Sequence, residues 1–152
     1  MFPLLNKHLY LGQDVDGYAV VSFNSNYTGG LMRSPLINPL PSYNENYADS
    51  LNTITNYNSG GSVNVYGGGT TTTVFTDWRL PTKTELDTII NLYDNTPASI
   101  TPINQVIWTS TNGVSDPTNA KYCMESGVSG YLLIEYDKSA LWAMMLVRSF
   151  TL

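Results

Sequence analysis

The sequence predicts an α+β fold, with two helices and an antiparallel sheet in a single domain covering 1–152. Two segments carry apolar residues at helical spacing, and four later stretches are rich in the β-branched and aromatic residues that favour strands. A chain of 152 residues can bury one substantial core but is short for two independent ones. We therefore expect both helices and the sheet to belong to one domain.

The first half of the chain predicts a strand, a loop and a helix. A strand is expected over Asp16–Phe23, where DGYAVVSF is rich in β-branched and aromatic residues. Residues 24–41 contain three prolines and are expected to form a loop. A helix is expected over Tyr43–Tyr57, because Ser42 and Glu45 have the spacing of a capping box.

The segment 58–76, NSGGSVNVYGGGTTTTVFT, has the most biased composition in the chain. Such density of glycine and serine is typical of a flexible linker. Four residues favour a different interpretation, a long ordered excursion with short strand pairing, and they are Val63, Val65, Val74 and Phe75. We expect the ordered excursion.

A second helix is predicted over Lys83–Tyr93, directly after the stretch DWRLPT. Pro81 cannot donate a backbone hydrogen bond and sets the chain for a helix start. Thr82 and Glu85 have capping-box spacing, and the Glu85 carboxylate would lie near the positive end of the helix dipole. The apolar residues that share one face of this helix are Leu86, Ile89, Ile90 and Tyr93.

The rest of the chain predicts a meander of antiparallel strands. The expected strands are Gln105–Thr111, Asn119–Ser126, Ser129–Asp137 and Ala140–Phe150. The short stretch DKSA predicts a hairpin between the last two. Alternation along the last strand predicts one face with Leu141, Ala143, Met145 and Val147, and a second face with Trp142, Met144, Leu146 and Arg148.

Two tryptophans and two arginines are the large side chains around these elements. Trp78 and Trp108 are expected to fill the core between helix and meander, because each ring N–H can find a buried acceptor. Arg79 and Arg148 are expected to pair with a carboxylate or to stack on the tryptophans. The candidate carboxylates are Asp77 and Glu85.

The composition excludes some classes of partner and favours others. The chain has 12 acidic and 7 basic residues and a net charge of -5, so we expect no nucleic-acid partner. Only 12% of residues are charged, and Asn, Thr, Ser, Gly and 11 Tyr supply a neutral surface typical of extracellular and virion proteins. The N-terminus lacks the pattern of a signal peptide, and no apolar run is long enough to cross a bilayer, so no membrane insertion is expected.

The titratable residues argue against an enzyme. His8 is the only histidine and lies near the N-terminus, and Cys123 is the only cysteine, which favours a buried apolar role over a nucleophile. Asp14 and Asp16 resemble the start of a calcium loop, but its later ligands are missing. We expect no catalytic residues, no metal site and no cofactor.

Three separated motifs together resemble a known domain family. They are WRLPTKTEL at Trp78–Leu86, WTST at Trp108–Thr111 and VR at Val147–Arg148. Their order and spacing over about Asp77–Phe150 are similar to those of a C-type-lectin-like family found in bacterial collagen-like adhesins and phage fibre proteins, distantly related to formylglycine-generating enzymes. Those enzymes use a pair of cysteines, and this chain has one.

The resemblance implies two helices packed on an antiparallel sheet that displays long loops. It implies a scaffold role for Trp78, Arg79, Pro81, Thr82, Glu85, Trp108, Ser110 and Arg148. The long segments are 24–41, 58–76 and 112–119, and their Tyr and Asn chemistry suits adaptable binding surfaces. The candidate ligand-binding residues are Tyr27, Tyr57, Tyr66, Asn112 and Asp116.

These observations predict a non-enzymatic virion structural or receptor-binding protein, such as a phage fibre, tip or decoration component. The expected partners are other copies of the chain, neighbouring virion proteins, and a host-surface glycan or protein. The alternative role of the same loops is to pack against identical subunits or a neighbouring virion protein, and the two roles are not exclusive. The alternatives are a bacterial cell-surface adhesin domain and an enzyme of the formylglycine-generating superfamily.

Overall fold

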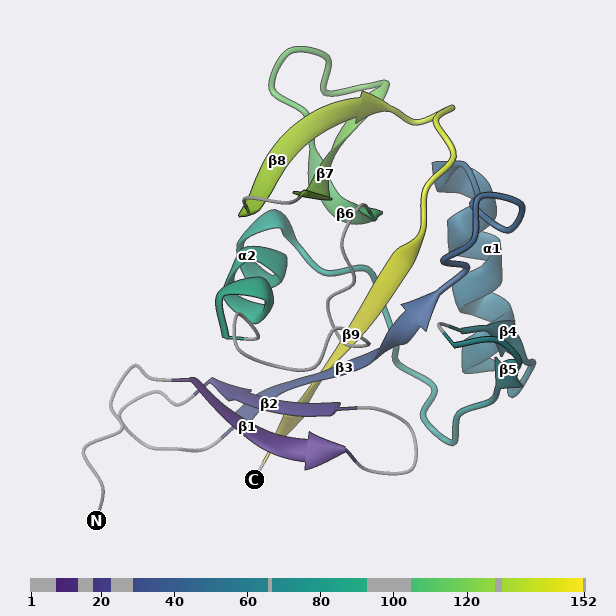
Figure 1. Ribbon diagram of the computed structural model, residues 1–152, viewed down its shortest axis with the longest axis vertical. Coiled ribbons are helices and arrows are strands. Elements are labelled where there is room, and N and C mark those ends of the chain that lie inside the picture. The colour runs from purple at the N-terminus through teal and green to yellow at the C-terminus, as the bar shows by residue number, and fades with distance from the viewer. Residues whose placement is uncertain are drawn as a thin grey trace.

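A computed structural model describes residues 8–13, 18–22, 29–65, 67–92, 105–127 and 130–151. Over these residues the fold is α+β, with two helices and mostly antiparallel strands (Figure 1). The helices are α1 (Tyr47–Asn58) and α2 (Lys83–Leu92). The strands are β1 (His8–Gln13), β2 (Tyr18–Ser22), β3 (Gly29–Ile37), β4 (Val63–Asn64), β5 (Thr70–Thr71), β6 (Val106–Asn112), β7 (Ala120–Gly127), β8 (Gly130–Asp137) and β9 (Met144–Thr151).

The strands form three antiparallel sheets, and β9, an edge strand of the first, also lies beside the β6 strand of the third. The sheet orders are β1-β2-β3-β9, β4-β5 and β6-β7-β8. The free edge of β9 pairs with the stretch before α2, because Arg79 and Val147 exchange backbone hydrogen bonds of 2.9 and 2.8 Å. Just before β9, Ala143 bonds the backbone of β6 through Val106 and Trp108. The last strand and the residue before it therefore join β3, the stretch before α2 and β6.

Both faces of β9 are buried, each against a different helix. Met145 and Val147 pack with Leu86 and Ile89 of α2, whereas Met144 and Leu146 pack on the side of α1. Figure 1 shows the two helices on opposite sides of this strand. The second cluster also contains Ile54, Tyr57, Trp78, Trp108 and Cys123. The predicted alternation of faces is confirmed from Trp142 to Val147, although Leu141 is 54% exposed.

The expected loop over 24–41 is wrong for residues 29–37, which form β3. Pro35 lies where the register between β3 and β9 shifts, and a proline is tolerated at such a bulge because no ladder bond is required of it. The Ser34 hydroxyl takes over there, accepting from the Leu146 N–H at 2.9 Å and donating to the Pro35 carbonyl at 2.7 Å. Residues 24–28 lie outside the described part of the chain.

The predicted hairpin between the last two strands is also wrong. The chain does turn at DKSA, where the Ala140 N–H donates to the Asp137 carbonyl at 3.0 Å. β9 then leaves the β6-β7-β8 sheet and pairs with β3. A strand that is apolar on both faces is more stable between two layers than at the edge of a half-exposed sheet.

The helices differ from expectation mainly at their ends. α1 begins at Tyr47 with Asn46 as its N-cap, whose side chain accepts from the Asp49 N–H at 2.8 Å. The proposed Ser42–Glu45 capping box does not form, because the Glu45 carboxylate bonds other side chains. α2 begins at Lys83 as predicted, and Tyr93, its expected last residue, lies outside the described residues.

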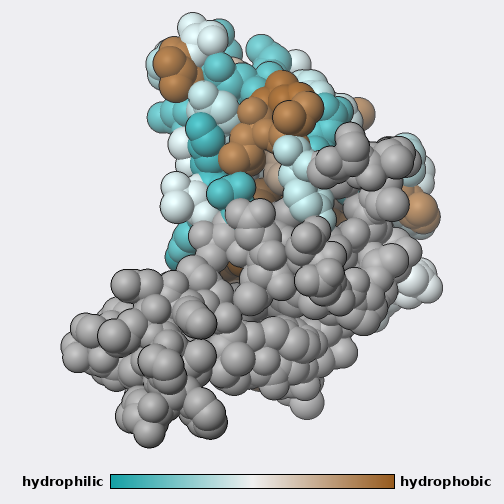
Figure 2. Space-filling model, turned by 60° about the vertical axis from the view of Figure 1, so that its left-hand side comes forward, coloured by the Kyte–Doolittle hydropathy of each residue, from teal (hydrophilic) through white to brown (hydrophobic). Residues whose placement is uncertain are grey.

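The remaining strand predictions agree with the structure. β2 lies inside the expected strand, whose ends at Asp16, Gly17 and Phe23 fall outside the described residues. β6, β7 and β8 match their predicted stretches closely, and Ser129 is outside the described part. In Figure 2 apolar surface gathers near the top of the molecule, over the β6-β7-β8 sheet, where Leu132 is 64% exposed.

We predict that Ser34→Ala lowers the free energy of unfolding by about 1–3 kcal/mol, because it leaves the buried Leu146 N–H without an acceptor. Urea denaturation measures the change. Ser139→Ala, in an exposed turn, is the matched control and should stay within about 0.5 kcal/mol of the parent. Equal stabilities of the two variants would contradict the role given to the Ser34 hydroxyl.

Candidate functional site

Over its described residues, the glycine- and threonine-rich segment is an ordered excursion with short strand pairing, as predicted, although Val74 and Phe75 lie outside the paired strands. Val63 and Asn64 pair with Thr71 and Thr70. The connecting turn has Gly67, Gly68 and Gly69 at φ of 93, 86 and 86°, the left-handed region that strongly favours glycine. A Cβ at any of these three would meet no atom within 4 Å, so their backbone conformation, not crowding, requires glycine.

The base of this excursion is fixed to the scaffold by Trp78. The Asn58 side chain donates to the Trp78 carbonyl and accepts from its N–H, both at 2.9 Å. The Trp78 ring N–H donates to the Thr73 hydroxyl at 2.9 Å, and Phe75 packs edge-on against the same ring. Trp78 is 2% exposed. The tryptophan is therefore core, as predicted, and it also ties the excursion to α1.

Between α1 and the excursion lies a hollow of about 530 Å³, here called the polar hollow. Most of its lining groups are neutral amides and hydroxyls, with two carboxylates and one tyrosine. The lining residues are Asn38, Ser42, Tyr43, Asn44, Glu45, Asp49, Asn52, Thr53, Asn56, Ser62, Val63 and Asn64. Side chains with both donors and acceptors suit a ligand rich in hydroxyl or amide groups.

Asn38 links β3, the excursion and the loop before α1. Its backbone is left-handed at φ 52°, a conformation that asparagine tolerates better than most residues. Its N–H donates to the Asn64 carbonyl at 2.9 Å, and its own carbonyl accepts from the Asn44 side chain at 2.6 Å. Its side-chain amide donates to Glu45. One buried asparagine thus positions three residues of the hollow.

Glu45 is the half-buried carboxylate of the hollow. Thr53 of α1 donates to both of its oxygens, at 2.7 and 2.9 Å. Its backbone is held by paired bonds to Trp142, and its carbonyl also accepts from the Trp108 ring N–H at 3.0 Å. Burial raises the pKa of the Glu45 carboxyl, although the hydrogen bonds from Thr53 and Asn38 oppose this.

Gly61 allows the excursion to pass close to α1. A Cβ at Gly61 would overlap the side-chain amide of Asn56, which lines the hollow. The Gly61 N–H also donates to the Asn56 carbonyl at 2.9 Å. The overlap is with the movable end of the exposed Asn56 side chain, so a side chain at residue 61 would displace this amide within the hollow.

A second cavity, of about 450 Å³ and here called the apolar chamber, adjoins the hollow. The two share Tyr43 and Asn64. The chamber is lined by Pro39, Leu40, Tyr43, Asn64, Val65, Gly67, Gly68, Gly69 and Gln105. Leu40 and Tyr43 are 54% and 45% exposed, so they present apolar surface beside the hollow.

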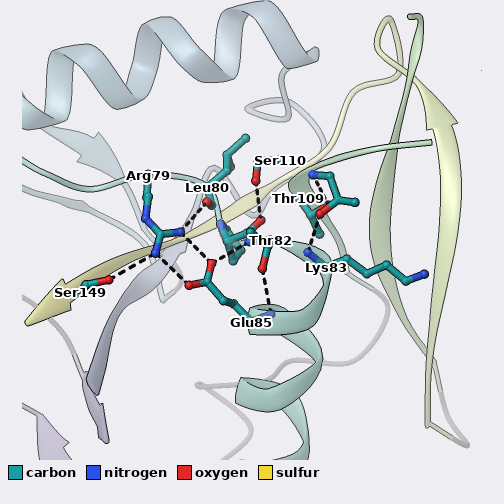
Figure 3. A network of polar contacts seen from close by, with 10 residues as sticks. Arg79, Leu80, Thr82, Lys83, Glu85, Thr109, Ser110 and Ser149 are labelled. Atoms are coloured by element: carbon teal, nitrogen blue, oxygen red, sulfur yellow. Dashed lines mark hydrogen bonds and ion pairs between the residues drawn. The ribbon is translucent and has the colours of Figure 1, made fainter. Parts of the chain in front are cut away.

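The motif that carries the family resemblance is a scaffold junction (Figure 3). Thr82 and Glu85 form the predicted capping box, with reciprocal bonds of 3.1 and 2.9 Å. Arg79 donates two hydrogen bonds, of 2.7 and 2.8 Å, to the Glu85 carboxylate. This pairing holds the pKa of Glu85 below its usual range. The Ser110 N–H donates to the Pro81 carbonyl at 2.9 Å, joining β6 to the helix start.

Arg148 and Trp108 also have structural roles. Arg148 pairs with Asp77 at 2.6 Å, as expected, and this contact lowers the pKa of Asp77. Its guanidinium lies 3.8 Å from the centre of the Phe75 ring, so the arginine stacks on a phenylalanine and not on a tryptophan. Trp108 is fully buried against Tyr47.

Of the five predicted ligand-binding residues, the three that the structure describes do not converge on one site. Tyr57 is 0% exposed inside α1, so its assignment to a binding loop is wrong. Tyr27 and Tyr66 lie outside the described residues. Asn112 and Asp116 are exposed near the β6–β7 connection, where Asn112 accepts from Lys121 at 2.6 Å and Asp116 bonds Asn119. Neither lines the polar hollow.

Sequence reasoning missed the asparagines that line the hollow. Asn52 and Asn56 are four apart in α1 and share a helical face, and asparagine is a poor helix former. Two asparagines on one exposed face of a predicted helix were the sequence feature that could have indicated a polar site there. The contribution of Asn38, Asn44 and Asn64 depends on tertiary contacts and left no local pattern.

Cys123 is a buried apolar residue, as predicted. It is 0% exposed, and burial raises the pKa of its thiol to about 12, so the reactive thiolate does not form near neutral pH. Within the described ranges, no three His, Cys, Asp or Glu side chains gather as metal ligands would. Neither described helix is long and apolar enough to cross a membrane.

Comparison with models of known protein families found no match, and a search of curated proteins found no relative of this chain.

We predict opposite pH dependences for two glutamate variants. The raised pKa of Glu45 means that ionisation costs stability as pH rises, so the stability of Glu45→Gln relative to the parent should increase from about pH 3 to about pH 7. The lowered pKa of Glu85 means that its ionisation stabilises the fold above its usual pKa and that this gain is lost in acid. Glu85→Gln should therefore lose relative stability over the same range.

Urea denaturation of the parent and both variants at several pH values measures these slopes. Each glutamine keeps the shape of the carboxylate, so each variant is the control for the other. Parallel slopes for the two variants would contradict the assignment of Glu45 as a desolvated carboxylate and Glu85 as an ion-paired one.

Proposed function

We propose that this chain is a non-enzymatic structural and receptor-binding protein of a phage particle, a fibre, tip or decoration component of C-type-lectin-like fold. The polar hollow carries the proposal. It has the volume of a small-molecule site, and it lies between a helix and an excursion that are both fixed to a rigid scaffold. Its neutral amides and hydroxyls suit recognition of a glycan or a polar protein segment on a host surface.

The family resemblance supports the biological setting. The residues of its three motifs form the scaffold junction in which Arg79, Glu85 and Pro81 connect α2, β6 and β9. A C-type-lectin-like domain uses such a scaffold to display irregular loops, and the hollow lies beside the longest described excursion. The apolar surface over the β6-β7-β8 sheet, where Leu132 of β8 is 64% exposed, supports contact with other copies or neighbouring virion proteins.

The test uses fluorescently labelled protein and a panel of bacterial cells. We expect binding to the cells of a host, and we expect Asn52→Arg to weaken it by about tenfold or more, because the new side chain fills the hollow. Thr55→Arg is the matched control, since Thr55 is also exposed on α1 but does not line the hollow. A protein that is monomeric in solution and binds neither cells nor phage particles would overturn the proposal.

Labelling with an antibody separates the virion from the cell-surface alternative. The proposal expects the antibody to decorate phage particles. Decoration of the bacterial surface, with an upstream signal peptide or collagen-like stalk in the gene, would identify an adhesin domain instead.

A further inference from the structure

The polar hollow and the apolar chamber adjoin each other, and together they are called the groove. They share Tyr43 and Asn64, and the turn that presents Tyr43 is fixed by bonds from the Tyr43 and Asn44 N–H groups to the Leu40 carbonyl, at 2.8 and 3.1 Å. Asn64 is held from the other side by the bond that its carbonyl accepts from Asn38. The boundary between the halves is therefore built from fixed backbone.

The charges of the groove restrict its ligand. Among the described residues, Glu45 and Asp49 are the only charged ones that line the groove, and no described lysine or arginine lines either half. An anionic ligand would meet repulsion without a counter-charge. The neutral lining groups include the side chains of Asn44, Asn52 and Asn56, which offer donors and acceptors together. The hollow therefore disfavours an anionic ligand and offers hydrogen-bond partners to one with several hydroxyls.

The chamber favours a small apolar group attached to that ligand. Pro39, Leu40 and Val65 supply apolar surface, and the turn Gly67–Gly69 presents only backbone. Its volume of about 450 Å³ exceeds the needs of a methyl or acetyl group and admits the adjoining ring as well. The half-exposed ring of Tyr43 lies between the halves, where an aromatic face can pack against the C–H face of a sugar.

We propose that the groove binds an uncharged oligosaccharide that carries N-acetyl groups, with sugar hydroxyls in the polar hollow and an acetyl methyl in the apolar chamber. The inference rests on the proposed function and names the ligand class of the same site. The amide of each N-acetyl group matches the Asn64 side chain and the chain's exposed backbone at the glycine turn. Tyr43 orients the ring between the two halves.

The experiment compares two sugars of the same linkage that differ at one substituent. Titration calorimetry with the trimer of β-1,4-linked N-acetylglucosamine should give binding at least about tenfold tighter than with cellotriose, which has a hydroxyl in place of each N-acetyl group. The trimer of glucosamine is a third probe, because its amines are cationic. Equal Kd values for the first two sugars, or binding of neither, would overturn the inference.

Single-residue variants test the contribution of each half of the groove to sugar binding. Leu40→Ser should remove most of the preference for the N-acetylated trimer and leave the weaker cellotriose binding in place, because it alters only the chamber. Leu51→Ser, also exposed but on another face of α1, should change neither. Asn52→Arg should abolish both. An unchanged preference in Leu40→Ser, or tightest binding of the glucosamine trimer with loss in high salt, would contradict the chamber's role.

The outcome separates this inference from the function on which it rests. A protein that binds host cells through the hollow, with loss in Asn52→Arg, but does not prefer the N-acetylated trimer retains the proposed function and loses the inference. A protein that binds no cell and no particle loses the proposed function, whatever its affinity for the free sugars.

Discussion

The burial of both faces of β9 is the constraint on which the rest of the structure depends. Met145 and Val147 face the cluster of α2, and Met144 and Leu146 face the cluster of α1. Its two edges are also used, one by β3 and the other by Arg79. Since Met144 to Val147 are buried on both faces, a shift of either helix would disturb the packing of this part of the strand.

The position of β9 also explains why the motifs that carry the family resemblance have structural roles. Arg79 contributes its backbone to the edge of β9 and its guanidinium to Glu85 at the start of α2. Trp78, one residue earlier, holds the base of the glycine-rich excursion through Asn58 and Thr73. The junction at Trp78 and Arg79 thus fixes one end of the glycine-rich excursion, so this irregular segment keeps a defined position beside α1.

The chemistry of the candidate site follows from the residues that this arrangement leaves half-buried. Asn38 and Thr53 both donate to Glu45, so a partly desolvated carboxylate remains at the wall of the hollow. The pKa of the Glu45 carboxyl is raised because burial disfavours its charged form. The other lining groups are mostly neutral, and the shared Tyr43 and Asn64 connect them to apolar surface.

The sequence by itself determined the local elements: the capping box of α2, the strands β6 to β8, the alternation of β9 and the paired strands of the excursion. Each depends on neighbouring residues whose spacing or composition is visible in one dimension. Only the tertiary structure decided that β3 is a strand despite Pro35, that β9 leaves its neighbour β8, and that Tyr57 is core. The polar hollow also emerged only there, because Asn38 and Asn64 are distant in sequence and meet through a single backbone bond.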